Sequence, residues 1–214
     1  MQLHEQYRPR TWADVVGQGK IVEKIDTLRN RGLAGRAYWL SGISGSGKTT
    51  IARLIAGEVA DEFSTDEIDA EGLTPIKVQE LERSSYIRGM GSLSGRAIII
   101  NEAHGLKKAT IRQLLVTLER VSPHAVWLFT TTADGQESMF DDCVDAHPLL
   151  SRCVVLGLAQ QGLAKVFAAR AQAIAQAEGL GGSSFEECVK LLKAKKNNMR
   201  AALQAIESGE LLAA

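Results

Sequence analysis

The sequence has few of the residues that define disulfide-bonded, zinc-binding or membrane proteins. Its three cysteines, Cys143, Cys153 and Cys188, are widely spaced and form no CxxC pair, which argues against a zinc site or a disulfide framework. We therefore expect a reduced, cytoplasmic protein. No apolar run approaches the length of a bilayer span, and the polar N-terminus has no signal-peptide core, so no membrane partner is expected. The 25 basic and 25 acidic residues cancel, so any nucleic-acid surface must be local.

One complete phosphate-binding motif is present, GISGSGKTT at positions 42–50. It matches GxxxxGK[ST], in which glycines let backbone N–H groups reach phosphate oxygens where a Cβ would clash. Lys48 supplies a charge for the β- and γ-phosphates, and the Thr49 hydroxyl is placed to ligate Mg²⁺. An apolar strand before the motif and helical spacing after it put the phosphates at a helix N-terminus. The residues predicted to bind ATP and Mg²⁺ here are Gly42, Ser44, Gly45, Ser46, Gly47, Lys48, Thr49 and Thr50.

A second chemical element begins with the isoleucine-rich segment at 96–101. Three consecutive isoleucines suit a parallel strand covered on both faces, and polar residues after such a strand face the ligand crevice. The run Asn101-Glu102-Ala103-His104 resembles the Walker B box hhhhDEAH, with Asn101 in place of aspartate. The resemblance makes Glu102 the catalytic base that polarises water. Asn101 can bind a magnesium-bound water but lacks the charge that holds the ion, so ATP binding can survive while hydrolysis slows.

Other segments resemble the ATPase subunits of sliding-clamp loaders, which belong to the AAA+ class. The N-terminal arm is similar to the YRP…VVGQ segment of the bacterial gamma/tau subunits and of the replication factor C small subunits. The stretch at 114–120 is similar to their LLxTLE segment. The resemblance implies that the arm lies over the adenine. The residues it implies for the base pocket are Tyr7, Arg8, Pro9, Val16 and Gln18.

The same resemblance implies roles for three further positions. Thr131, at the end of a buried strand, matches sensor 1, with Thr130 and Thr132 as alternatives. Arg152 lies in a Ser-Arg-Cys box, where the family keeps an arginine finger that reaches the γ-phosphate of a neighbouring subunit. Arg200 lies in a Met-Arg-Ala-Ala-Leu run similar to sensor 2, which contacts the γ-phosphate of its own subunit. A finger used in trans implies an oligomer with other AAA+ subunits.

The order of these motifs predicts an α/β fold, a P-loop AAA+ doubly wound parallel five-stranded sheet followed by a small all-helical lid domain. We expect the nucleotide-binding domain at 1–157 and the lid domain at 158–214, with a polar loop from Asp134 to His147. Clamp-loader subunits usually continue into a helical collar, whereas this sequence stops at Ala214. The zinc-binding cysteines of the bacterial subunits are also missing.

Two functions remain open at the level of sequence. The first is an ATP-driven subunit of a clamp-loader-like complex that engages DNA in replication or repair, with a sliding clamp as a possible partner. The second is a scaffold that binds ATP without hydrolysing it and lends Arg152 to a partner ATPase, as Asn101 suggests. A Holliday-junction motor is a third hypothesis, which the Ser-Arg-Cys box and the YRP arm argue against.

Contact with DNA is expected to be electrostatic and mainly to phosphates. In clamp loaders, the helices near four basic residues of this sequence face the central channel. Each of the four is equally well explained as an ordinary solvated side chain. The residues are Arg88, Lys107, Lys108 and Arg112.

Overall fold

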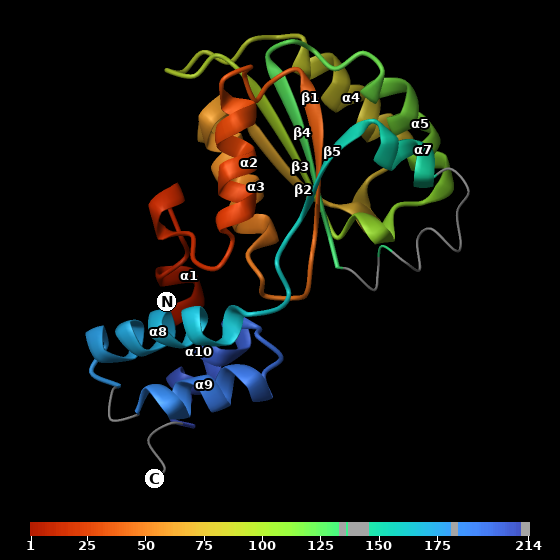
Figure 1. Cartoon of the computed structure of the whole chain (residues 1–214). Coiled ribbons are helices and arrows are strands. Elements are labelled where there is room, and N and C mark those ends of the chain that lie inside the picture. Colours follow the sequence, from red (N-terminus) through yellow and green to blue (C-terminus); the bar gives the residue numbers. More distant parts are fainter. Residues whose placement is uncertain (133–135, 137–145, 181–183, 211–214) are drawn as a thin grey trace.

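Five parallel strands form a single sheet in the order β2-β3-β4-β1-β5 (Figure 1). The computed structural model describes the chain except residues 133–135, 137–145, 181–183 and 211–214. The inner strands are almost wholly buried because helices cover both faces of the sheet, which explains their continuous apolar runs. The predicted doubly wound parallel sheet is confirmed. The strands are β1 Arg36–Ser41, β2 Thr65–Asp69, β3 Arg96–Asn101, β4 Ala125–Thr131 and β5 Cys153–Gly157.

Helices α2 (Gly19–Arg29) and α3 (Lys48–Val59) cover one face of the sheet, and α4 (Pro75–Ser85), α5 (Lys108–Leu118) and α7 (Ala146–Ser151) cover the other (Figure 1). The polar loop was predicted to extend to His147, and this bound was wrong. Helix α7 already begins at Ala146 because Ala146 and Leu149 are buried in the core. The rest of that loop, apart from Gln136, lies outside the described residues. Short 3-10 helices are η1 Trp12–Asp14, η2 Glu62–Ser64, η3 Ala70–Gly72 and η4 Ala103–Gly105.

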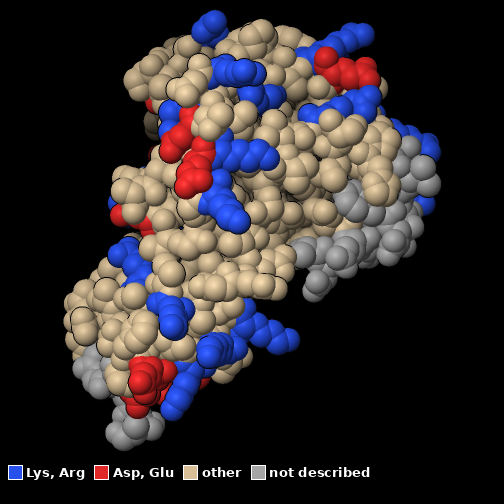
Figure 2. Space-filling model, viewed as in Figure 1, with Lys and Arg blue, Asp and Glu red and all other residues tan. Residues whose placement is uncertain are grey.

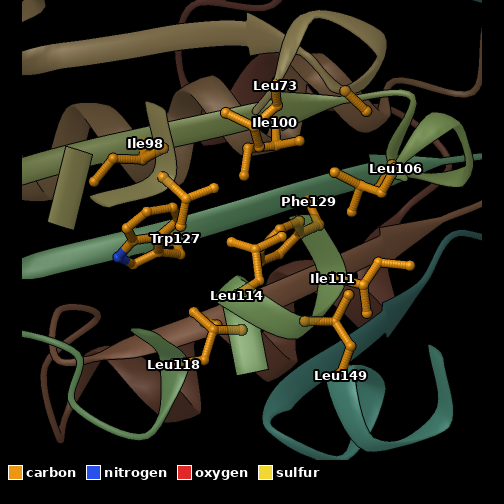
Figure 3. Close-up of a cluster of buried hydrophobic side chains, with 14 of the residues drawn as sticks. Leu73, Ile98, Ile100, Leu106, Ile111, Leu114, Leu118, Trp127, Phe129 and Leu149 are labelled. Carbon is orange, nitrogen blue, oxygen red and sulfur yellow. The ribbon is translucent and has the colours of Figure 1, made fainter. Parts of the chain in front are cut away.

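The alternation of side chains along β3 and β4 decides which way the polar strand ends face. Ile98 and Ile100 pack with Trp127 and Phe129 against α5 and neighbouring elements (Figure 3). Ile99 points to the opposite face and joins the core beneath α3. Because strand side chains alternate with period two, the last residue of β3 falls on the α3 side of the sheet. The Walker B position is thereby directed toward the phosphate-binding loop.

Three helices follow the sheet and form a separate apolar core below it (Figure 1). They are α8 (Leu163–Ala177), α9 (Phe185–Ala194) and α10 (Met199–Glu207). Ser184 caps α9 through a reciprocal capping box with Glu187. The short N-terminal helix α1 (Leu3–Gln6) was not predicted, and Leu3 is buried in the core of these three helices. Among the described residues, no helix has the length and apolarity needed to cross a membrane.

Candidate nucleotide-binding site

The predicted phosphate-binding loop joins the end of β1 to the start of α3. Gly45 and Gly47 have φ values of +71° and +101°, a backbone region that side chains other than glycine rarely adopt. Lys48 is buried, and its Nζ donates hydrogen bonds to the carbonyls of Gly42 (3.1 Å) and Ile43 (2.9 Å). Burial lowers the pKa of Lys48, the charge of Glu102 opposes this shift, and Arg200 adds to it. The loop therefore encloses a positive charge at the N-terminus of α3, which suits a polyphosphate.

The two predicted metal-binding residues lie next to each other. The Thr49 hydroxyl lies 3.3 Å from Asn101 Oδ1, and the Thr130 hydroxyl donates to the same oxygen at 3.0 Å. On its other side, Asn101 Nδ2 donates to Glu67 Oε1 at 2.7 Å. Burial tends to raise the pKa of Glu67, but hydrogen bonds from Arg53 and Asn101 lower it overall. The paired oxygens of Thr49 and Asn101 fit a hard divalent cation.

Glu102 has a left-handed backbone, with φ of 51° and ψ of 49°, at the start of η4. For a residue other than glycine this conformation is uncommon and is often associated with functional sites. Its carboxylate lies 3.5 Å from His104 Nδ1, which in turn lies 3.3 Å from the Thr131 hydroxyl. Thr131 is thus linked to Glu102 through His104. Thr130, on the opposite face of β4, instead forms a direct hydrogen bond with Asn101. Of the three candidate sensor residues, Thr130 and Thr131 therefore contact different parts of the Walker B segment.

A pocket opens between the N-terminal arm, the phosphate-binding loop and the helices α8 and α10. Many of its lining side chains are apolar or aliphatic, as expected for a site that holds a flat ring. Among the described residues, ten that were predicted to bind nucleotide line this pocket. They are Tyr7, Arg8, Pro9, Val16, Gln18, Gly45, Ser46, Gly47, Thr50 and Arg200.

Gln18 lines this pocket, but its amide is already engaged. Its Oε1 accepts from the backbone N–H of Ala159 at 2.8 Å, and its Nε2 donates to the Ala159 carbonyl at 3.4 Å. Ala159 lies in the linker between β5 and α8. Gln18 therefore joins the arm to this linker, a role that the base-pocket prediction did not include.

The part of the pocket formed by α8 was not predicted from the sequence. Phe167, Arg170 and Ile174 line it from one face of that helix. Their spacing of three and four residues is the signal that could have found them, because it sets a charged residue among apolar neighbours on one helical face. Arg170 brings a second cation from the helical unit beside Arg200, which suits a ligand with several negative charges.

Asn198, another residue that sequence analysis missed, lies against Gly45 of the phosphate-binding loop. Its Oδ1 caps α10 by accepting from the backbone N–H of Ala201 at 3.0 Å. A Cβ added to Gly45 would lie only 1.9 Å from the same oxygen. The helical unit thus rests directly on the loop, at a position where only glycine fits.

We expect Gly45→Ala to weaken ATP binding by at least about tenfold, because the left-handed backbone alone costs about 1–2 kcal/mol for a side chain and Asn198 must also move. Binding of a fluorescent ATP analogue checks this expectation. Gly57→Ala is the matched control, since that glycine is within α3 and a Cβ there meets no atom within 4 Å. Equal affinities of the two variants would contradict the close fit between Asn198 and the loop.

Arg152 does not line the pocket of its own chain. Its Nη2 donates to Glu119 Oε1 at 2.6 Å, and its Nη1 donates to the Pro148 carbonyl at 3.0 Å. Its Nε is buried and has no hydrogen-bond partner among the described residues, and the side chain is 30% exposed. Hydrogen bonds to Glu119 and Pro148 therefore hold the guanidinium of Arg152 in one orientation at the surface.

Comparison with known proteins agrees with this geometry. Residues 38–160, more than half of the chain, match the family described as the ATPase family associated with various cellular activities (AAA). The chain belongs to the AAA family. Membership implies nucleotide binding, and the matched segment of this AAA protein runs from within β1 to the linker after β5.

Two relatives of this AAA protein are subunits of DNA polymerase III. Subunit gamma of Buchnera aphidicola subsp. Acyrthosiphon pisum is 29% identical over 190 residues, which are 77% of this chain and 50% of the relative. Subunit tau of Escherichia coli is 28% identical over 172 residues, which are 68% of this chain and 26% of the relative. The chain thus spans half or less of the length of these relatives.

Solved structures of RuvB variants from Thermotoga maritima share the fold. One has a TM-score of 0.72 at 20% sequence identity and covers 94% of this chain and 65% of that protein. At this identity the likeness shows the fold alone. It includes the helical unit as well as the sheet, because nearly the whole chain is covered.

Proposed function

We propose that this AAA protein is the ATP-binding subunit of a clamp-loader-like complex that acts on DNA in replication or repair. Similarity to the gamma and tau subunits over most of this chain supports the proposal. The observation that carries it is the pocket formed jointly by the arm, the phosphate-binding loop and the helical unit. A ligand held at this seam stabilises one arrangement of the lid and sheet, so ATP can act as a conformational switch.

The proposed chemistry assigns one task to each group in the site. Lys48 holds the β- and γ-phosphates, and Thr49 with Asn101 holds Mg²⁺, which when bound neutralises charge on the phosphate oxygens. Glu102 orients the attacking water and accepts its proton. Thr131 and Arg200 contact the γ-phosphate from the sheet and from the lid.

We also propose that hydrolysis requires a neighbouring AAA+ subunit. Arg152 lies outside the pocket of its own chain and is partly exposed, which suits a finger that completes the site of another subunit. Glu119 and Pro148 hold it in place until such contact is made. Assembly as a ring or spiral would then couple ATP binding in one subunit to catalysis in the next.

The expected DNA contacts rest on exposed basic residues. All four predicted residues, Arg88, Lys107, Lys108 and Arg112, are exposed, and the last three lie at or near the start of α5. The face in Figure 2 has Lys and Arg spread over both parts of the molecule with acidic groups between them, so charge on this face is mixed. Binding through phosphates should therefore be local and should weaken as salt is raised.

A second candidate function is a scaffold that binds ATP and activates a partner without turning over itself. The neutral Asn101 favours it, because an amide oxygen holds a divalent cation less firmly than a carboxylate does. In this case Arg152 would still serve the partner. The two functions differ in whether this chain hydrolyses its own ATP and in whether it acts on DNA.

The deciding experiment measures ATP binding and steady-state hydrolysis with and without primed DNA, for the native chain and for Asn101→Asp. We expect the native chain to bind ATP and to hydrolyse it slowly, DNA to stimulate the rate, and Asn101→Asp to raise it by about tenfold or more, since a restored carboxylate strengthens the metal site. Asn30→Asp, on the exposed end of α2, makes the same chemical change away from the pocket and should alter nothing.

Three results would change these conclusions. Binding with hydrolysis only in Asn101→Asp would establish the scaffold in place of the motor. A DNA affinity that does not depend on salt, or no affinity in the presence of ATP, would contradict the clamp-loader proposal. Failure of the native chain to bind ATP would overturn both candidate functions.

A further inference from the structure

Glu67 forms a contact with the Walker B position that no motif in the sequence indicates. It lies on the edge strand β2, which pairs with β3 so that Glu67 is opposite Ile99 and Asp69 is opposite Asn101. Its Oε1 accepts from Asn101 Nδ2 at 2.7 Å. From the other side, Arg53 donates to Oε2 at 2.8 Å and to Oε1 at 3.0 Å. The carboxylate is thus fixed between a residue of α3 and the Walker B amide.

This contact matters because asparagine, unlike aspartate, has two chemically different ends. Its oxygen can face a cation, whereas its NH₂ group carries donors and cannot ligate one. The hydroxyls of Thr49 and Thr130, which contact Asn101 Oδ1, can each donate or accept and therefore accommodate either orientation. Among these contacts only Glu67, an acceptor, discriminates between the two ends of the amide.

The reversed amide would place its oxygen against the Glu67 carboxylate and its NH₂ group beside Thr49. Two acceptors at hydrogen-bond distance repel each other, and the NH₂ group would occupy the place of a metal ligand. The observed orientation avoids both problems. Arg53 contributes by holding the carboxylate with two hydrogen bonds, so that Glu67 cannot easily turn away from the amide.

We propose that Glu67 is a positioning residue for magnesium, which holds the Asn101 amide with its oxygen directed at Thr49. The inference rests on the proposed function, in which ATP binds with Mg²⁺ at this site. It explains how a Walker B segment with asparagine can keep a metal-binding geometry. It also predicts that the need for Glu67 is specific to asparagine, because the two oxygens of an aspartate are equivalent and require no orientation.

A double-mutant cycle tests the proposal. Glu67→Ala is made in the native chain and in the Asn101→Asp background, and Mg²⁺ is titrated into each protein with a fluorescent ATP analogue. In the native background we expect Glu67→Ala to raise the half-saturating Mg²⁺ concentration by about tenfold or more, as loss of such supporting contacts does elsewhere. In the Asn101→Asp background the new carboxylate faces that of Glu67 and repels it, so Glu67→Ala should not raise the midpoint there and should if anything lower it. Analogue binding in EDTA should be equal for each variant and its parent.

Arg53→Ala is the partial variant, because it removes the support of the carboxylate but leaves the bond to Asn101 possible. It should shift the Mg²⁺ midpoint much less than Glu67→Ala does. An equal shift by Glu67→Ala in both backgrounds would overturn the proposal, since it would mean that Glu67 acts through its charge or through folding. No shift in either background would also overturn it. A native chain that binds no ATP analogue would instead refute the proposed function.

Discussion

Replacing Arg152 by alanine should lower ATP hydrolysis by the assembled protein by about 10³-fold or more while leaving ATP binding intact. The physical reason is that this arginine is outside the pocket of its own chain, so removing it takes no contact away from bound ATP. It removes the positive charge that a neighbouring subunit needs in the transition state. Equilibrium binding of an ATP analogue and single-turnover hydrolysis separate the two effects.

A mixing experiment shows whether the finger acts in trans. Lys48→Ala subunits keep Arg152 but lose the charge that holds the phosphates, and Arg152→Ala subunits keep the pocket but lose the finger. Each alone should be inactive, and a mixture should regain part of the activity if the two complement each other in the assembly. Arg120→Ala, an exposed arginine next to Glu119, is the control and should behave as the native chain. Loss of ATP binding in Arg152→Ala would show a contact within one chain and contradict the finger.

Glu102→Gln should slow hydrolysis by about 10²–10⁴-fold, the usual contribution of a general base, and should leave ATP affinity unchanged. Glutamine has nearly the same shape but cannot accept a proton from water. The carboxylate is 3.5 Å from His104 Nδ1, and its charge partly opposes the lowering of the Lys48 pKa by burial, so it lies near the lysine of the phosphate-binding loop. Rapid-quench measurement of the chemical step, with analogue binding in parallel, checks this expectation.

The control for Glu102 is Glu62→Gln, an exposed carboxylate in η2. It should change neither the rate nor the affinity. An unchanged rate in Glu102→Gln would mean that the base is another residue. A loss of affinity together with the rate would mean that the left-handed backbone at Glu102 serves to shape the loop and that its carboxylate is not the base.

The sequence was informative wherever a motif is continuous in the chain. The phosphate-binding loop could be recognised because all its groups come from nine neighbouring residues. Strand β3 could be recognised because a strand covered on both faces has a continuous apolar run. Strand β2 carries little apolar signal, since only Ile68 among its residues packs against a core cluster. Short elements were harder, since the four residues of α1 and the six of α7 carry too little periodicity to be recognised.

Contacts between distant segments could not be predicted in the same way. The bond from Asn101 to Glu67 depends on strand order and register, neither of which is written in the local pattern of either strand. The approach of Asn198 to Gly45 joins positions far apart in the chain, and it exists only because α10 begins above the loop. The resemblance to a family predicted which residues of the arm line the base pocket. It did not predict the two hydrogen bonds between the Gln18 side chain and the backbone of Ala159, which depend on the three-dimensional fold.

The N-terminal arm has a mechanical consequence. Leu3 is buried with the lid helices, its backbone N–H donates to Glu207 at 3.4 Å, and the Tyr7 hydroxyl donates to Glu178 at 2.6 Å. The arm is therefore fastened to the helical unit formed by α8, α9 and α10, so any rotation of this unit against the sheet would carry the arm along. A fluorophore placed at Met1 would then follow the angle of the lid, and it would report the nucleotide state in real time without altering the pocket.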